Sequence, residues 1–182
     1  PWNYPISIAV AKIFRPLFMG NTVVVKPASH TPLSTLYLGE LIKDILPKGV
    51  FNVLSGPGKM GGWLCEHPDV KFISFTGSVE VGKTIAKIAA EDLKGVSLEL
   101  GGNDPSIVMS DTDLDKHAEA IFWGAFRNTG QICIATKRLY VHEDIFDNLV
   151  ARLCKIASAV KVGDGLEPGV TMGPVNNSGQ LA

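Results

Sequence analysis

Three side chains in this sequence have the types needed for covalent catalysis: a thiol, a carboxylate and a carboxamide. Cys133 lies between two isoleucines and follows the pair Gly130-Gln131. Its thiolate would be a nucleophile, and the glycine lets the backbone come close to a substrate. Glu99 ends a strand-like run before two glycines, and Asn3 lies near residue 1. Together they could supply a nucleophile, a general base and an oxyanion donor.

Each of these residues also has a purely structural interpretation. A cysteine is commonly a small buried apolar residue. A carboxylate at the end of a strand is commonly solvated, and an asparagine before a helix can cap it. Considered one at a time, Cys133, Glu99 and Asn3 leave these alternatives open.

Strand-like and helix-like segments alternate along the first hundred residues. The sequence predicts strands at 22–25, 50–54, 71–75 and 96–99, and helices at 6–18, from Pro32 to Leu41, through Trp63 and Leu64, and at 81–90. This order is typical of parallel βαβ units, in which ligands bind at the carboxyl ends of the strands. The helix at 6–18 is apolar on nearly every side and is expected to be buried, and Thr31 is expected to cap the next helix.

The pattern begins again after Gly102. It predicts a strand at 107–109 and then a helix that begins with capping residues at 111–113 and leads to Cys133. A strand at 138–141, an amphipathic helix from Ile145 and a loop-like tail follow. We therefore expect an α/β fold. An incomplete Rossmann-like parallel sheet with flanking helices occupies 1–100, and the first part of a second, thiol-bearing α/β catalytic domain occupies 101–182.

Composition restricts the class of protein. Apolar residues make up 46% and charged residues 19% of the chain, as in a globular core, and the net charge of -1 provides no electrostatic basis for binding nucleic acid or a membrane surface. No apolar run is long enough to span a bilayer.

The three cysteines have neither disulfide-scaffold nor metal-site spacing. We therefore expect a cytoplasmic protein without a metal, with Cys65 and Cys154 in the core. Because no Met opens the chain and Pro1 already belongs to a motif, we expect a piece of a longer protein.

Several stretches, in order along the chain, resemble motifs of the aldehyde dehydrogenase superfamily. They are Pro1-Trp2-Asn3-Tyr4-Pro5, Lys26-Pro27-Ala28, Phe75-Thr76-Gly77-Ser78, Glu99-Leu100-Gly101-Gly102, Gly130-Gln131-Ile132-Cys133 and Thr171-Met172-Gly173-Pro174. The resemblance covers the whole chain, which would be the middle of such a protein. It implies an enzyme that oxidises a small-molecule aldehyde to a carboxylic acid with NAD(P). It also implies that the full-length enzyme is a homodimer or homotetramer. It implies that Cys133 attacks the aldehyde, Asn3 stabilises the oxyanion, and Glu99 activates the water that releases the acid.

The resemblance also implies which residues hold the dinucleotide. They are Trp2, Lys26, Ser29, Gly58, Gly77, Ser78, Val81, Gly82 and Leu100. Lys26 would contact the adenosine ribose, and Gly77-Ser78 at a helix N-terminus would receive the pyrophosphate. Many NAD-preferring members carry a glutamate at the position of Ser29, which repels a 2′-phosphate. The expected cofactor is NADP or NAD, with a leaning toward NADP. In the alternative, Ser29 only caps a turn and both cofactors bind alike.

Two alternatives belong to other functional classes. Gly77 to Thr84 matches the phosphate-binding loop G-x-x-x-x-G-K-[ST] of NTPases in full. Against it, two valines and Glu80 occupy positions where a phosphate cradle needs small residues. In the second alternative, the chain is a dinucleotide-binding or structural module without turnover, because by the resemblance it lacks the first strands of the cofactor domain and the oligomerisation segment.

Overall fold

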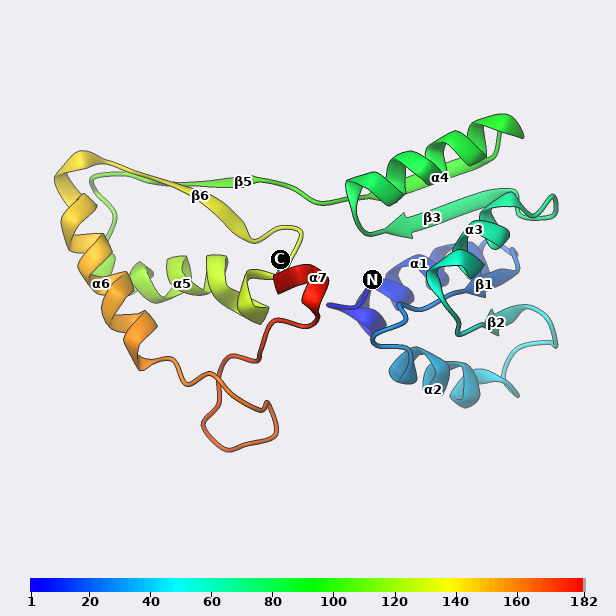
Figure 1. Cartoon of the computed structure of the whole chain (residues 1–182), viewed down its shortest axis with the longest axis horizontal. Helices are drawn as coiled ribbons and strands as arrows, with labels where there is room; N and C mark the ends of the chain where they lie inside the picture. The colour runs from blue at the N-terminus through cyan, green and yellow to red at the C-terminus, as the bar shows by residue number, and fades with distance from the viewer. Residues whose placement is uncertain (182) are drawn as a thin grey trace. The chain divides into compact units, whose positions relative to one another are not determined.

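The computed structural model describes residues 1–181, which form two compact units, Pro1–Gly101 and a second that begins at Gly102. Each unit contains parallel strands joined by helices (Figure 1). The α/β class with parallel pairing that the sequence predicts is therefore confirmed. The strands pair two by two, in the orders β1-β2, β3-β4 and β5-β6, so the expected parallel arrangement consists of short ladders.

The first unit alternates helices and strands in the predicted order. Its elements are α1 (Pro5–Phe18), β1 (Val23–Val25), α2 (Leu33–Ile42), β2 (Phe51–Val53), α3 (Gly58–Glu66), β3 (Phe72–Thr76), α4 (Val79–Glu91) and β4 (Gly95–Glu99). Val23 pairs with Phe51 in one ladder and Phe72 pairs with Gly95 in the other. Helical connections join strands that run in the same direction, so their carboxyl ends face the same edge of each ladder.

The core of the first unit lies between α3, α4 and the β3-β4 ladder. Ile85 and Ala89 are one helical turn apart on α4, and both pack with Cys65 of α3 and Ile73 of β3. Burial raises the pKa of the Cys65 thiol, although the nearby charge of Lys94 opposes the shift. Cys65 is therefore a core residue, as predicted.

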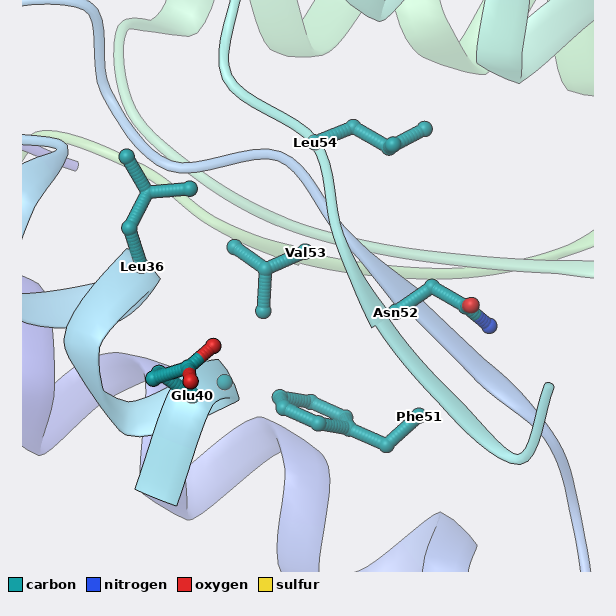
Figure 2. A pocket seen from close by; sticks show the side chains of 7 residues that line it. Leu36, Glu40, Phe51, Asn52, Val53 and Leu54 are labelled. Atoms are coloured by element: carbon teal, nitrogen blue, oxygen red, sulfur yellow. The ribbon is translucent and has the colours of Figure 1, made fainter. Parts of the chain in front are cut away.

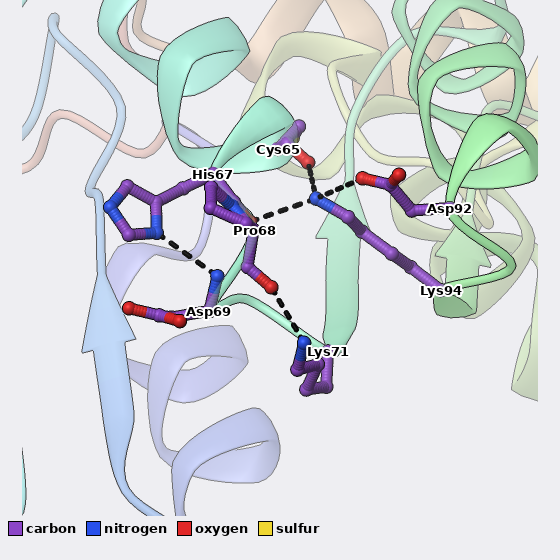
Figure 3. Close-up of polar contacts among 7 residues, drawn as sticks. All are labelled: Cys65, His67, Pro68, Asp69, Lys71, Asp92 and Lys94. Carbon is purple, nitrogen blue, oxygen red and sulfur yellow. Dashed lines mark hydrogen bonds and ion pairs between the residues drawn. The ribbon is translucent and has the colours of Figure 1, made fainter.

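A buried lysine joins the end of α3 to the connection between α4 and β4 (Figure 3). The Lys94 side chain is 2% exposed, and its ammonium group donates to the carbonyls of Cys65 at 2.7 Å and His67 at 2.9 Å. The Asp92 carboxylate lies 3.4 Å away and is an exposed ion-pair partner. These contacts satisfy carbonyls at a helix C-terminus, where no further helical N–H is available.

The second unit contains β5 (Asp104–Val108), α5 (Leu114–Phe126), a 3₁₀ turn at Arg127–Gly130, β6 (Thr136–Val141), α6 (Phe146–Ala159) and the short α7 (Ser178–Leu181). Asp113 caps α5 by accepting from the N–H groups of Asp115 and Lys116, as its position predicts. Val108, Leu114, Ala118 and Leu149 form the core of this unit.

Some local expectations are wrong. In α1 Phe14 and Phe18 are 66% and 79% exposed, because the described part of the chain places no layer over that face. Thr31 does not cap α2, because that helix begins at Leu33 without a side-chain cap. The Thr31 hydroxyl donates instead to the carbonyl of Trp2 at 3.1 Å. Cys154 is exposed rather than buried, because it points away from the face of α6 that packs through Leu149.

Candidate active site

The segment before Cys133 is a left-handed turn. Asn128, Thr129 and Gly130 have φ values of 51°, 60° and 71°. Positive φ is unfavourable for a non-glycine residue and most of all for a β-branched one, so the turn needs support from its surroundings. Thr129 Oγ1 donates to the carbonyl of Gly173 at 2.8 Å, which connects the turn to the tail of the same unit.

Hydrogen bonds within the turn add to this support. Gln131 Nε2 donates to the Asn128 carbonyl at 2.9 Å, and Asn128 Nδ2 donates to the Gln131 carbonyl at 3.3 Å. The backbone N–H of Asn176 donates to Gln131 Oε1 at 3.0 Å. The Gly-Gln pair therefore organises the loop that carries the thiol, in addition to any space it leaves for a substrate.

Cys133 is a half-buried free thiol on this loop. A Cβ added at Gly102 would lie 3.3 Å from the Cys133 carbonyl oxygen and 2.4 Å from Asp104 Oδ1. The segment that begins the second unit therefore passes close to the Cys133 backbone, and a side chain at Gly102 would displace it. This close approach is a packing reason for glycine at this position.

Glu99 lies at the carboxyl end of β4, with an exposed side chain. Its partner in the ladder is Thr76, and its carbonyl accepts the N–H of Gly77 at 3.1 Å. A Cβ at Gly77 would lie 2.4 Å from the Phe75 ring. The glutamate and the glycine loop therefore emerge next to each other from adjacent parallel strands.

Sequence reasoning missed Lys12, which lies on α1. Its ammonium group donates to Ser74 Oγ at 2.9 Å. Burial lowers the pKa of Lys12, while the negative charge of Glu99 opposes that shift. Lys12 is therefore close enough to Glu99 for the two charges to interact. The available signal was a single lysine inside the otherwise apolar run 8–14.

Asn3 also belongs to the first unit, just before α1. Its Oδ1 accepts the N–H of Tyr4 at 3.1 Å, and α1 has no side-chain cap. The alternative that Asn3 serves as the N-cap of this helix is therefore wrong. The contact of Thr31 with the Trp2 carbonyl ties this segment to the loop after β1, so the Trp2-Asn3 segment and the Lys26 loop are neighbours.

The predicted dinucleotide residues follow the carboxyl ends of strands. Lys26 comes directly after β1, Gly77 and Ser78 after β3, and Leu100 after β4, while Gly58 begins α3. Parallel α/β folds bind ligands at this edge. Trp2, in the segment before α1, is the exception to this placement.

The N-terminus of α4 is shaped by Ser78 and Gly82. Ser78 caps the helix by accepting the N–H of Val81 at 3.3 Å. A Cβ at Gly82 would lie 2.6 Å from Leu100 Cδ2, so the helix packs directly on the residue after Glu99. The first turn of α4 has N–H groups without helical acceptors, which is the usual binding position for a phosphate.

The loop after β1 has its own polar contacts. Lys26 Nζ donates to the Pro27 carbonyl at 3.0 Å, and burial lowers the pKa of this lysine. A Cβ at Gly61 of α3 would lie 3.6 Å from the Lys26 stem. Ser29 Oγ donates to the Gly56 carbonyl at 3.0 Å, so its hydroxyl proton is engaged within the protein.

The geometry does not match the phosphate-binding loop of an NTPase. That motif needs a loop between its two glycines, but α4 already begins at Val79. Gly82 and Thr84 therefore lie inside a helix, and Thr84 Oγ1 donates to the Glu80 carbonyl at 3.2 Å. In a phosphate-binding loop this hydroxyl binds Mg²⁺, whereas here it is bonded to its own helix.

Other features of the described residues do not add a site. A cavity of about 360 Å³ lies between α2 and β2 and is lined by Leu36, Glu40 and Phe51 among others (Figure 2), but by none of the predicted catalytic or cofactor residues. Within residues 1–181, no group of His, Cys, Asp or Glu could hold a metal ion. No described helix combines the length and apolar character needed to cross a membrane.

Comparisons with known proteins agree with the motifs. A family model described as the aldehyde dehydrogenase family matches residues 1–182. The phenylacetaldehyde dehydrogenase of Pseudomonas fluorescens is 49% identical over 96% of this chain and 35% of its own length. The NADP(+) succinate-semialdehyde dehydrogenase of Escherichia coli K12 is 46% identical over 96% of the chain and 37% of its own length.

A solved structure gives the same result. The structure of PnpE from Pseudomonas sp. WBC-3 in complex with nicotinamide adenine dinucleotide matches with a TM-score of 0.93 and 41% identity, covering 97% of this chain and 37% of that one. The chain thus spans a little over a third of the length of the relatives that it matches.

Proposed function

Because the chain belongs to the aldehyde dehydrogenase family, we propose that it forms the central part of an enzyme that oxidises an aldehyde to a carboxylic acid with NAD(P)+. The observation that carries this proposal is the supported left-handed turn that presents the free thiol of Cys133. A turn with unfavourable φ angles, held in place by several hydrogen bonds, is typical of a functional position.

In the proposed mechanism the Cys133 thiolate attacks the aldehyde carbon. The backbone N–H of Cys133 and the Asn3 carboxamide donate to the oxygen of the thiohemiacetal. NAD(P)+, when bound, supplies the hydride acceptor, and a thioester remains on Cys133. Glu99 then removes a proton from water, which attacks the thioester and releases the acid.

The residues of the first unit fit a dinucleotide. A Cβ at Gly77 or Gly82 would crowd the side chains of Phe75 and Leu100, and the N-terminus of α4 is available for an anion. We propose that Lys26, Ser29, Gly58, Gly77, Ser78, Val81, Gly82 and Leu100, with Trp2, form this binding surface. The leaning toward NADP rests on the serine at position 29 and on the nearby charge of Lys26.

The identity of the aldehyde is a question for a substrate panel. One relative is named for phenylacetaldehyde and another for succinate semialdehyde. A panel with one apolar and one carboxylated aldehyde, read by absorbance of the reduced cofactor, would assign the class. The same preparation, measured by light scattering, would test the proposal of a homodimer or homotetramer, and fractionation of source cells would test the cytoplasmic location.

The experiment that tests the proposal is Cys133→Ala in the full-length enzyme. We expect loss of aldehyde oxidation and loss of labelling by a substrate-like electrophile. Cys65→Ala and Cys154→Ala are the matched controls and should retain both. Because Cys154 is exposed, a general thiol reagent would label it as well, so the electrophile must resemble the substrate. Aldehyde oxidation by Cys133→Ala would contradict the mechanism.

We also propose that the 182-residue chain does not turn over substrate by itself. Phe18 is 79% exposed and Leu33 is 78% exposed, and two-stranded ladders have unpaired edges. Expression of this chain alone should yield aggregated or inactive protein. A monodisperse chain that reduces NAD(P)+ with an aldehyde would disprove this.

A further inference from the structure

Lys137 lies near the start of β6, shortly after Cys133, and its side chain turns back toward the loop that carries the thiol. Its ammonium group donates to the carbonyls of Gly130 at 3.2 Å, Ile132 at 3.2 Å and Ala135 at 3.4 Å. A lysine ammonium has three N–H donors. All of them can therefore be used on carbonyls that bracket Cys133.

The Ile132 carbonyl is the important acceptor, because it belongs to the same peptide group as the Cys133 N–H. A peptide group is planar, and the described backbone has no cis bond. In a trans peptide the C=O and the N–H point in opposite directions. Whatever holds the Ile132 carbonyl therefore also sets the direction of the Cys133 N–H.

The Ile132 carbonyl is held from two sides. It accepts the backbone N–H of Ala135 at 3.2 Å as well as the Lys137 ammonium. A positive charge on the carbonyl oxygen also polarises the peptide group, which makes its N–H a stronger donor. The bond to Gly130 restrains the other side of the loop, where the chain leaves the left-handed turn.

We propose that Lys137 is a positioning residue, which holds the Cys133 N–H in the direction of the thiohemiacetal oxygen and strengthens it as a donor. This inference rests on the proposed function, in which Cys133 is the nucleophile and its N–H is an oxyanion donor. Lys137 itself does not touch the substrate. Its effect reaches the reaction through the Ile132-Cys133 peptide.

The test uses the full-length enzyme with Lys137→Met, which keeps the length of the side chain and removes its charge and donors. Lys137→Gln is a second variant, which retains a neutral donor, and Lys137→Arg is the conservative one. Lys155→Met is the matched control, because Lys155 is an exposed lysine on α6 for which the described residues provide no hydrogen bond or ion pair.

Two rates separate a positioning role from a general loss of structure. The first is kcat/KM for the aldehyde, which depends on the oxyanion donor. The second is alkylation of Cys133 by iodoacetamide, a displacement that forms no oxyanion, measured in a Cys154→Ala background because Cys154 is exposed. A positioning residue for the donor should change the first rate and leave the second unchanged.

For Lys137→Met we expect kcat/KM to fall about tenfold, which is less than the roughly 10²–10³-fold loss on removing an oxyanion donor outright. The loss is smaller because Ala135 still holds the Ile132 carbonyl. Alkylation should stay within about twofold of the parent, and KM for NAD(P) should not change. Lys137→Arg should recover part of the activity, and Lys137→Gln should lie between the parent and Lys137→Met.

Several outcomes would overturn the inference. If Lys137→Met and Lys137→Gln keep kcat/KM within about twofold of the parent, the peptide does not depend on Lys137. If turnover and alkylation fall together, Lys137 acts on the thiol or on folding and not on the oxyanion donor. Turnover by Cys133→Ala would instead remove the proposed function itself, so the two failures are distinguishable.

Discussion

The backbone N–H of Gly77 donates to the carbonyl of Glu99 at 3.1 Å, at the carboxyl end of the β3-β4 ladder. This bond joins the proposed pyrophosphate loop to the proposed general base. Because it uses only backbone atoms, a change in the Glu99 side chain leaves it intact. The carboxylate can therefore be altered without disturbing the glycine loop beside it.

For Glu99→Gln we expect slower steady-state turnover with a preserved first burst of reduced cofactor. An amide cannot accept the proton of the attacking water, and a general base typically contributes about 10²–10⁴-fold to the rate. Stopped-flow absorbance of the reduced cofactor separates the two phases. Dinucleotide affinity should match that of the parent, because the Gly77 bond remains. Equal loss of both phases would assign Glu99 to activation of the thiol.

For Gly82→Ala we expect lower stability and weaker dinucleotide binding. The new Cβ would lie 2.6 Å from Leu100 Cδ2, and overpacking of this kind typically costs about 1–3 kcal/mol. Thermal unfolding and dinucleotide titration measure the two effects. Gly62→Ala in α3 is the control, because a Cβ there meets no atom within 4 Å.

A second variant identifies the contact responsible for the Gly82→Ala effect. Leu100→Ala removes the side chain against which the new methyl group would clash. The combined variant Gly82→Ala/Leu100→Ala should therefore be less destabilised than the sum of the single changes. Additive losses would mean that Gly82 is needed for a reason other than its contact with Leu100.

For Ser29→Glu we expect a selective loss of activity with NADP. Two like charges about 4 Å apart repel by roughly 1–4 kcal/mol between aqueous and surface dielectric limits, which corresponds to a loss of about fivefold to several hundredfold. The measurement is kcat/KM with each cofactor. Ser29→Ala is the control, because it removes the bond to the Gly56 carbonyl without adding charge. An unchanged NADP-to-NAD ratio in Ser29→Glu would show that position 29 does not contact the 2′ group.

For Lys94→Met we expect the protein to lose about 2 kcal/mol of stability or more, because the carbonyls of Cys65 and His67 would lose a charged donor in a buried position. Lys71→Met is the matched control. Lys71 lies close by and also donates to a carbonyl, that of Pro68, but it is exposed (Figure 3). Denaturant unfolding of both variants gives the comparison. Equal losses would mean that burial of Lys94 adds nothing.

Local signals were sufficient for the order of the elements and for several of their ends. Apolar spacing predicted α4 and β3 within a few residues, and Asp113 caps α5 as expected. The motif residues Lys26, Gly77 and Leu100 follow strands, so their location at the carboxyl ends could be predicted from strand order alone. These properties depend on neighbours in the chain, and neighbours are visible in a sequence.

The tertiary structure decided which surfaces and donors are used. Cys65 and Cys154 both lie on helices, but only Cys65 is buried, because a neighbouring strand and helix cover its face. The hydroxyl of Thr31 binds Trp2, far away in sequence, in place of its own helix. Lys137 had no role predicted from sequence, since its side chain gains one only when the turn brings the carbonyls around Cys133 within reach. Such contacts depend on the path of the folded chain, which local periodicity does not encode.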